Sequence, residues 1–310
     1  MRLLVVGAGS TGGYFGGRLA QAGRDVTFLV RPARAAQLHE KGLRIVSPHG
    51  DATLHPNVVT TDAIAGPYDV VLLTVKGFQL EAALDELAPA VGPETMILPV
   101  LNGMRHMDVI AARFSPHNLV GCALKVATVL EEDGRIVQLA PLQDLAYGEL
   151  DGSITARIQA LDTFMRGADI GARLSNVIRR EMWEKWILLA SLGAITCLMR
   201  GTIGEIEACS GGTTFALRLL DEVIAIVGAV GEAPSDTFVK SAREQLTAKG
   251  SPLTSSMFRD LQRGRPIEAE TIVGDLVRRG AKAGIAAPLL SATYVHLLVY
   301  QSKRITAVPK

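Results

Sequence analysis

The chain has 310 residues, with 32 Lys and Arg against 31 Asp and Glu, and 48% of its residues are hydrophobic. This length favours two domains, each with its own core. The near balance of charge leaves no strongly basic surface for nucleic acid or for membrane lipid. The composition is therefore typical of an ordinary globular protein that handles small molecules.

Three cysteines are widely spaced, Cys122, Cys197 and Cys209. Their odd number and spacing indicate neither a disulfide framework nor a metal site, and they predict a reducing, cytoplasmic location. The apolar run at residues 3–6 is too short for a signal peptide. Other apolar stretches are interrupted by polar residues well before the roughly 20 residues that a membrane span requires. We therefore expect neither secretion nor a membrane span.

The first half of the chain alternates short β-rich runs with helical stretches, as in parallel strands joined by crossover helices. Because the apolar residues of these runs are continuous, both faces of the sheet should be covered. The pattern predicts an α/β domain with a doubly wound parallel sheet, and residues 135–148 predict antiparallel strands that extend one edge. The predicted parallel strands are residues 2–7, 25–31, 69–76, 96–102 and 119–126.

From about residue 175 onward the strand pattern ends and long apolar-periodic segments predict helices. Residues 167–175 contain three Gly or Ser residues at this change of pattern. We therefore predict an α/β domain at residues 1–173 and an all-helical domain at residues 174–310. The expected helices are residues 177–199, 215–230, 237–249 and 267–283.

A glycine-rich turn follows the first predicted strand directly and leads into a helix. Gly7 would make the tight turn, Gly9 would let the backbone approach a pyrophosphate, and Gly12 would let helix pack on strand. The start of the helix supplies unpaired N–H groups and partial positive charge to phosphates. The strand before the turn and the helix after it favour this interpretation over a merely tight turn. We predict a Rossmann domain whose cofactor contacts Gly7, Gly9, Ser10, Thr11 and Gly12.

The end of the second predicted strand indicates which nucleotide binds. A fold that binds NAD usually has an acid there for the ribose hydroxyls, whereas a 2′-phosphate is better held by a guanidinium. This chain has Arg31, with Arg34 three residues later and no acid between them. We therefore predict NADPH, with a solvated pair of surface arginines as the alternative.

Polar side chains also stand at the ends of two later strands, where ligands bind in open α/β sheets. Lys76 and Gln79 follow one strand and Asn102 ends the next. Lysine and asparagine are common caps at such positions, so these residues alone do not establish a site.

The helical half contains two further candidates. Lys185 lies between Trp183 and Trp186, which we expect to be buried. It either extends along the surface or is desolvated enough to act as a proton donor. Glu268 follows Pro266 at the start of a predicted helix, where the helix dipole alone would account for an acid.

Taken together, these motifs have the order and spacing of the ketopantoate reductase (2-dehydropantoate 2-reductase) family, which the chain resembles over essentially its whole length. The resemblance implies an NADP-binding Rossmann domain at residues 1–173 and a helical substrate-binding and catalytic domain at residues 174–310. It also implies reduction of a 2-oxo acid, with ketopantoate as substrate in pantothenate and coenzyme A biosynthesis. The motifs are the glycine turn, Thr74-Val75-Lys76, Asn102-Gly103, Trp183-Glu184-Lys185, Ser255-Ser256-Met257 and Glu268.

The resemblance also implies a role for each matched residue. Lys185 would protonate the emerging alkoxide, and Glu268 would hold a substrate hydroxyl or orient Lys185. Ser256 would bind the substrate. The remaining expected contacts are Asn102 and Lys76 with both substrate and cofactor, and Gln79 and Glu268 with the cofactor.

Two positions depart from the family pattern, which commonly has asparagines where this chain has Leu189 and Gly193. Loss of a partner for a substrate hydroxyl weakens binding strongly. A paralogous reductase of another 2-oxo acid therefore stays open beside ketopantoate reduction. After Asn102, Arg105 could recruit a further carboxylate, and we expect His106 to be a surface residue at a helix start.

A remote alternative is a protein that senses NADPH without turning it over. Such a protein has no need for Lys185 and Glu268 in one site. The expected partner is a small 2-oxo acid, without nucleic acid or membrane. The apolar residues 294–300 could cover a domain or a neighbouring subunit, so the sequence leaves a homodimer open.

Overall fold

The computed structural model describes residues 1–306, which form two compact units. The first unit comprises Met1–Leu101 and His106–Arg179, and the second comprises Asn102–Arg105 and the chain from Arg180 onward. The sequence predicts a boundary between residues 173 and 174. The division comes later because the strand at Ala172–Leu174 pairs within the first unit.

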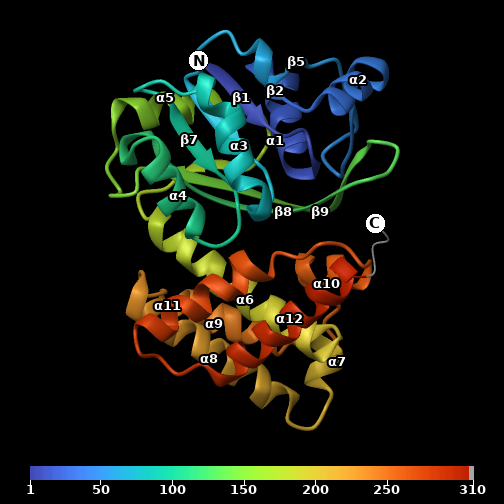
Figure 1. Cartoon of the computed structure of the whole chain (residues 1–310), viewed down its shortest axis with the longest axis vertical. Coiled ribbons are helices and arrows are strands. Elements are labelled where there is room, and N and C mark those ends of the chain that lie inside the picture. Colours follow the sequence, from blue (N-terminus) through green and yellow to red (C-terminus); the bar gives the residue numbers. More distant parts are fainter. Residues whose placement is uncertain (307–310) are drawn as a thin grey trace. The chain divides into compact units, whose positions relative to one another are not determined.

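The first unit contains a five-stranded parallel sheet, in the order β5-β2-β1-β6-β7 (Figure 1). The doubly wound Rossmann prediction is therefore confirmed. At the centre of the sheet, the side chains of β1 from Leu3 to Val6 are buried, because strands flank β1 on both sides and helices cover the sheet. The strands are β1 (Arg2–Val6), β2 (Asp25–Leu29), β5 (Asn57–Val59), β6 (Val70–Leu73) and β7 (Met96–Pro99). The helices are α1 (Ser10–Gln21), α2 (Pro32–Lys41), α3 (Leu80–Leu87), α4 (Arg105–Arg113) and α5 (Ala156–Met165), with short 3₁₀ turns at Thr61–Ala63, Gly77–Gln79, Ala88–Ala90 and Pro116–Asn118.

A second, mixed sheet corrects two predictions. Residues 119–126 do not form another parallel strand: after one parallel bridge from Leu119 to Ile97, the chain enters β8, which pairs antiparallel with β9. Residues 135–148 form one long strand of this separate sheet, and Pro141 is tolerated because it lies where the β8–β9 register shifts. The strands are β3 (Leu43–Val46), β4 (Ala52–Leu54), β8 (Gly121–Leu130), β9 (Ile136–Gly148) and β10 (Ala172–Leu174), in the order β10-β9-β3-β4 with β8 beside β9.

Helix α1 lies between the two sheets, and its glycines make this possible. A Cβ atom on Gly16 would stand 2.8 Å from Val5 Cγ2 of the parallel sheet. A Cβ on Gly13 would stand 2.3 Å from Ile136 Cδ1, and one on Gly17 would stand 2.8 Å from Ile45 Cδ1, both in the second sheet. The helix can therefore contact both sheets only without side chains at these positions.

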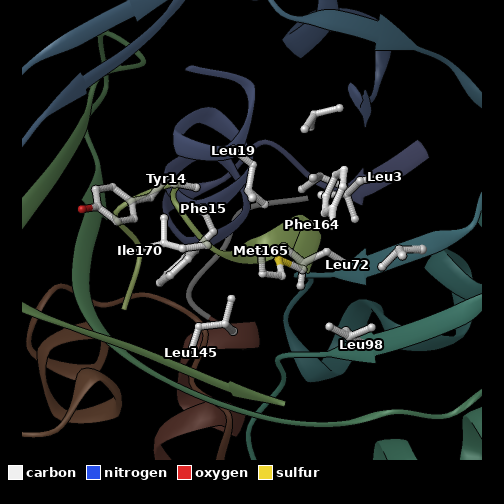
Figure 2. Close-up of a cluster of buried hydrophobic side chains, with 14 of the residues drawn as sticks. Leu3, Tyr14, Phe15, Leu19, Leu72, Leu98, Leu145, Phe164, Met165 and Ile170 are labelled. Carbon is white, nitrogen blue, oxygen red and sulfur yellow. The ribbon is translucent and has the colours of Figure 1, made fainter. Parts of the chain in front are cut away.

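The hydrophobic core of the first unit surrounds this helix (Figure 2). Its side chains come from both sheets, from α1 and from α5, and the apolar run of β8 packs against α1. The labelled members are Leu3, Tyr14, Phe15, Leu19, Leu72, Leu98, Leu145, Phe164, Met165 and Ile170.

The second unit is helical, as predicted. The expected helices at residues 177–199, 215–230, 237–249 and 267–283 correspond to α6, α8, α9 and a π turn that continues into α11. Three further helices, α7, α10 and α12, were not expected. The bounds are α6 (Ile178–Met199), α7 (Ile203–Glu207), α8 (Gly212–Val230), α9 (Asp236–Leu246), α10 (Ser256–Gln262), the π turn (Glu270–Gly274), α11 (Asp275–Lys282) and α12 (Pro288–Thr306).

Helix α6 is long and apolar enough to cross a bilayer by length and composition. However, 67% of its most apolar window is buried inside the structure. The core helix of a folded domain has the same character, because it is surrounded by protein instead of lipid.

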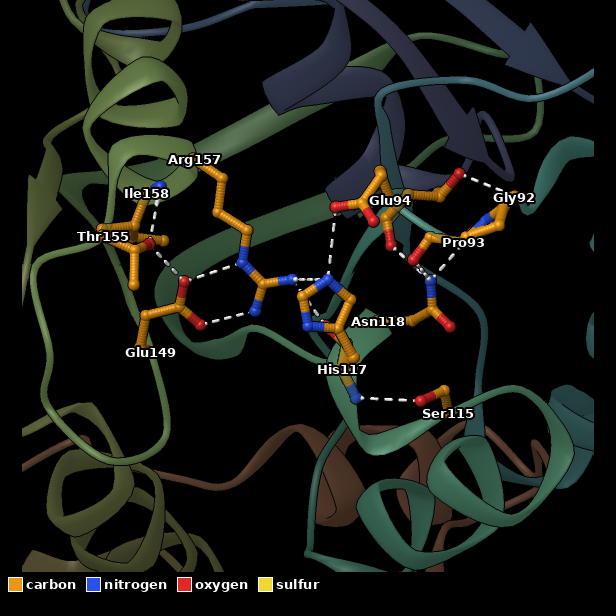
Figure 3. Close-up of polar contacts among 11 residues, drawn as sticks. Gly92, Pro93, Glu94, Ser115, His117, Asn118, Glu149, Thr155, Arg157 and Ile158 are labelled. Carbon is orange, nitrogen blue, oxygen red and sulfur yellow. Dashed lines mark hydrogen bonds and ion pairs between the residues drawn. The ribbon is translucent and has the colours of Figure 1, made fainter.

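An ion pair between the half-buried Arg157 and the buried Glu149 joins the end of β9 to the first turn of α5 (Figure 3). Arg157 donates two hydrogen bonds to Glu149, at 2.7 and 2.8 Å, and Thr155 donates a third at 2.6 Å. A further donation from Arg157 reaches the carbonyl of His117 at 2.6 Å. The guanidinium lowers the pKa of the Glu149 carboxyl below its ordinary value.

We expect Arg157→Met to lower the free energy of unfolding by about 3 kcal/mol at neutral pH, because it leaves a buried carboxylate without its cation. Since the pKa of Glu149 is lowered in the folded state, the stabilisation by this pair is complete above the unfolded pKa and declines as the pH falls. Urea unfolding of both proteins at neutral pH and near pH ~4 should show the difference shrinking in acid.

The matched control is Arg113→Met, which removes an exposed ion pair with Asp85. We expect it to cost at most about 1 kcal/mol. Equal losses for the two variants would contradict a special contribution from Arg157.

Candidate functional site

The glycine turn is closed on one side and open on the other. Gly7 has a φ of +94°, which favours glycine. A Cβ on Gly12 would stand 2.2 Å from both the Gly7 carbonyl oxygen and Thr74 Oγ1, whereas a Cβ on Gly9 would meet nothing within 4 Å. Thr74 also donates to the carbonyl of Val6 at 2.7 Å, which ties β6 to the start of the turn. The space over Gly9 is therefore where a ligand can approach the backbone.

Helix α1 presents an uncapped N-terminus at this turn. Its N-cap, Gly9, has no side chain to accept from the first-turn N–H groups, and the first turn contains no acidic residue. These groups, at Ser10 and Thr11 among others, give a helix start its affinity for anions. The turn thus fits the pyrophosphate of a dinucleotide.

Two arginines follow β2. Arg31 is exposed as the N-cap residue of α2. Arg34 Nε donates to the carbonyl of Ala8 in the glycine turn at 3.1 Å, and its Nη2 is buried without a hydrogen-bond partner among the described residues. Burial and then the nearby Arg44 lower the pKa of Arg34. An unpaired guanidinium donor beside this turn fits an anionic group such as a phosphate.

The sequence predicts a phosphate contact for Arg31 and does not identify Arg34 as a site residue. The signal for Arg34 was its position one turn into α2, which places it over the glycine turn.

Lys76 and Gln79 lie together at the carboxyl end of β6. Gln79 Oε1 accepts from the Lys76 backbone N–H at 3.4 Å, and the Gln79 N–H donates to the Lys76 carbonyl at 2.8 Å. Because β1 and β6 are neighbouring parallel strands, this turn is at the same edge of the sheet as the glycine turn. The side chain of Lys76 is exposed there.

In the second unit, the structure brings Asn102 and Glu268 together across 166 residues of sequence. Asn102 Nδ2 donates to Glu268 Oε2 at 3.3 Å, and Glu268 is 8% exposed. The position of Glu268 behind Pro266 predicted that it lies in the first turn of a helix. In the structure Glu268 lies just before the helical segment instead. Its carbonyl accepts from the Ile272 N–H at 3.0 Å, so Glu268 precedes the helical segment that begins with the π turn.

The π turn is where several site elements meet. Trp186 Nε1 donates to the carbonyl of Ile272 at 2.9 Å. A Cβ on Gly103, whose φ is +81°, would stand 2.4 Å from the Thr271 carbonyl oxygen, so the backbone after Asn102 packs directly on the turn. π turns within helices are frequent at functional sites.

Lys185 precedes Trp186 on α6, so it too is held next to an anchor of the π turn. Lys185 is half-buried, and Trp183 and Trp186 on either side are buried, as expected. Lys185, Asn102 and Glu268 are therefore carried by elements that all contact the Glu270–Gly274 turn.

Ser256 is exposed as the first residue of α10. Ser255 is the N-cap of this helix, accepting from the Phe258 N–H at 3.0 Å, and it is bonded to Thr196 Oγ1 at 3.0 Å. The Ser255 hydroxyl is thus used by the protein itself. This explains physically why a pair of serines occurs here, one for the helix start and one at the surface.

His106 corrects another expectation. It is 3% exposed, whereas the sequence placed it at the surface. It belongs to the buried face of α4 together with Met107 and Ile110, and Arg105 is the exposed residue at this helix start.

No group of three or more His, Cys, Asp or Glu residues that could hold a metal ion occurs in the described part of the chain. The cysteines are free, and Cys122 and Cys197 are buried.

Comparisons with known proteins identify the family of the chain. The family model described as ketopantoate reductase PanE/ApbA matches residues 3–152, and the model of its C-terminal region matches residues 177–301. The uncharacterized oxidoreductase YkpB of Bacillus subtilis is 32% identical, over 98% of this chain and 100% of its own.

Two solved structures are similar in fold. The 2-dehydropantoate 2-reductase of Geobacter metallireducens GS-15 is 28% identical with a TM-score of 0.86, covering 96% of this chain and 99% of its own. A D-mandelate dehydrogenase in a ternary structure with NADH and anilino(oxo)acetate is 20% identical with a TM-score of 0.87, covering 98% and 99%. The chain belongs to the ketopantoate reductase family and is an oxidoreductase of that family.

Proposed function

We propose that the protein uses NADPH to reduce a 2-oxo acid to the corresponding 2-hydroxy acid. The observation that carries this proposal is the gathering of Lys185, Asn102 and Glu268 on elements that contact one π turn. A cation, an amide and a carboxylate held in this way suit a reaction that places negative charge on a carbonyl oxygen. The uncapped start of α1 and the unpaired donor of Arg34 support a dinucleotide phosphate as the partner of the first unit.

In this proposal Lys185 Nζ donates a proton to the oxygen that was the keto group. NADPH, when bound, supplies the hydride. Ser256 donates its hydroxyl hydrogen bond to the substrate carboxylate. Glu268, which accepts a hydrogen bond from Asn102, holds the ammonium of Lys185. A proton donor of this type contributes about 10²–10⁴-fold to a rate.

Ketopantoate is the substrate that the family suggests, since the structure from Geobacter metallireducens is named as a 2-dehydropantoate 2-reductase. The protein would then act in pantothenate and coenzyme A synthesis, in the cytoplasm that its three free cysteines favour. The likeness to the D-mandelate dehydrogenase solved with NADH and anilino(oxo)acetate extends only to the fold at this level of identity.

The function is tested by following NADPH oxidation with the purified protein. Ketopantoate and a panel of other 2-oxo acids are supplied separately, with pyruvate as the smallest member. We expect saturable turnover with at least one branched 2-oxo acid. Tight NADPH binding without turnover on any of these acids would favour a sensor of the cofactor and would overturn the proposed reaction.

Cofactor preference gives a separate prediction. Arg31→Ala should raise the Kd for NADPH about tenfold or more, because a charge-assisted bond to the 2′-phosphate is lost, and should change the Kd for NADH by less than about twofold. The substitution should not destabilise α2, because the Arg31 side chain makes no capping hydrogen bond to this helix. Fluorescence titration of both nucleotides measures the two constants.

Two further variants complete the cofactor experiment. Arg263→Ala, at an exposed position after α10, should leave both constants unchanged. Arg34→Ala should weaken both nucleotides, since Arg34 is bonded to the glycine turn itself. An equal loss of NADPH and NADH affinity in Arg31→Ala would argue against a contact with the 2′-phosphate.

A further inference from the structure

The face of α6 that continues from Lys185 carries no polar side chain for two turns. Residues four apart on a helix lie on one face, so Lys185, Leu189 and Gly193 form a stripe along α6. Leu189 is half-buried and Gly193 is buried. A substrate whose keto oxygen meets Lys185 therefore meets hydrocarbon on the next turn of this helix.

Met257 fills the place of a side chain at the far end of the stripe. A Cβ on Gly193 would stand 2.8 Å from Met257 Cε, and Met257 is 3% exposed. Met257 follows Ser256, to which the proposed function assigns the substrate carboxylate. The thioether thus brings a second apolar surface to the Gly193 end of the same stripe.

Two other hydroxyl groups near this stripe, those of Thr196 and Ser255, already have partners. Thr196, three residues after Gly193, donates to the carbonyl of Leu192 at 2.6 Å, and its oxygen is also bonded to Ser255 Oγ at 3.0 Å. Ser255 in turn accepts from the start of α10. Using either hydroxyl for a substrate would break a bond inside the second unit.

We propose that the preferred substrate is a 2-oxo acid whose third carbon carries an apolar branched or aromatic substituent without a hydroxyl group. This inference rests on the proposed function and narrows it. The physical reason is desolvation: a hydroxyl placed against Leu189 and Met257 loses its bonds to water without replacement. Burying a hydroxyl without a hydrogen-bond partner costs a free energy that corresponds to about a tenfold to hundredfold loss of binding affinity.

A matched pair of substrates tests the proposal directly. Ketopantoate is 4-hydroxy-3,3-dimethyl-2-oxobutanoate, and 3,3-dimethyl-2-oxobutanoate differs from it by this one oxygen atom. We expect kcat/KM with NADPH to be at least about tenfold higher for the acid without the hydroxyl. A ratio near one, or a preference for ketopantoate, would overturn the proposed substrate class and leave the reductase function intact.

A variant tests whether Leu189 determines the preference. Leu189→Asn provides a donor and an acceptor on the stripe, and should shift the ratio of the two kcat/KM values toward ketopantoate by about tenfold. Leu217→Asn is the matched control, because Leu217 is also half-buried but lies on α8, which carries none of the assigned site residues. It should leave the ratio unchanged.

The outcomes separate the two levels of the proposal. If Leu189→Asn and Leu217→Asn shift the ratio equally, Leu189 is not the determinant and the inference fails. If the wild-type protein reduces neither acid nor any other in the panel, the proposed function itself fails. The melting temperatures of the variants show whether each variant is folded. If a variant does not fold, the ratio of the two kcat/KM values in the wild-type protein still decides the substrate class.

Discussion

Lys185→Ala is expected to lower kcat by about 10²–10⁴-fold while the Kd for NADPH changes by less than about twofold. The ammonium is the proposed proton donor to the keto oxygen, and without it the alkoxide must take a proton from water. The cofactor contacts assigned above all involve other residues, so binding should persist. Single-turnover kinetics and a fluorescence titration measure the two quantities independently.

Two variants control this experiment. Lys185→Arg keeps a positive charge, but a guanidinium does not give up its proton near neutral pH, so the substrate KM should be retained better than kcat. Lys240→Ala removes an exposed lysine of α9 and should have no effect. Turnover of Lys185→Ala equal to that of the wild-type protein would refute the assigned role.

Gly9→Ala and Gly12→Ala should separate cofactor binding from folding, although they alter the same turn. At Gly9, φ is −81° and ψ is −163°, which alanine adopts readily, and its methyl would enter open space. The apo protein should melt normally but bind NADPH about tenfold or more weakly, because the methyl occupies the approach to the pyrophosphate.

At Gly12 the methyl would meet backbone at 2.2 Å, so the turn or β6 must shift. Overpacking of this kind lowers the free energy of unfolding by about 3 kcal/mol. For a unit of this size, that loss lowers the melting temperature by roughly 10 °C. Thermal melts with and without NADPH measure both effects, since a ligand that binds the folded state raises the melting temperature. A normal melt of Gly12→Ala, or undiminished NADPH binding by Gly9→Ala, would contradict this account of the turn.

The parallel sheet could be predicted because its inner strands are continuous apolar runs separated by helical segments. The second sheet could not. Strands β4 and β10 have only three residues each, and β3 pairs with β9, so that Ile45 lies beside Ile136 far along the chain. The apolar run of β8 gave no sign that α1, instead of another layer of crossover helices, would cover it.

Some parts of the candidate site could also be predicted from the sequence and others could not. The glycine turn was predictable since its strand, turn and helix are contiguous. The contact between Asn102 and Glu268 spans 166 residues, so spacing alone could not predict it, and only the family resemblance placed both residues in one site. The sequence of residues 267–283 predicted a regular helix and gave no indication of the π turn. The burial of His106 depends on tertiary packing.

The four glycines of α1 have a consequence for folding. Each glycine costs a helix about 1 kcal/mol relative to alanine, so the segment at Ser10–Gln21 has little tendency to be helical by itself. It gains its stability from packing against strands as far away as β9, which are contacts of high sequence separation. We therefore expect the uncapped N–H groups at its start to become available to a phosphate only after both sheets have assembled around it. The cofactor turn would then form late in folding, and nucleotide binding would report on the integrity of the entire first unit.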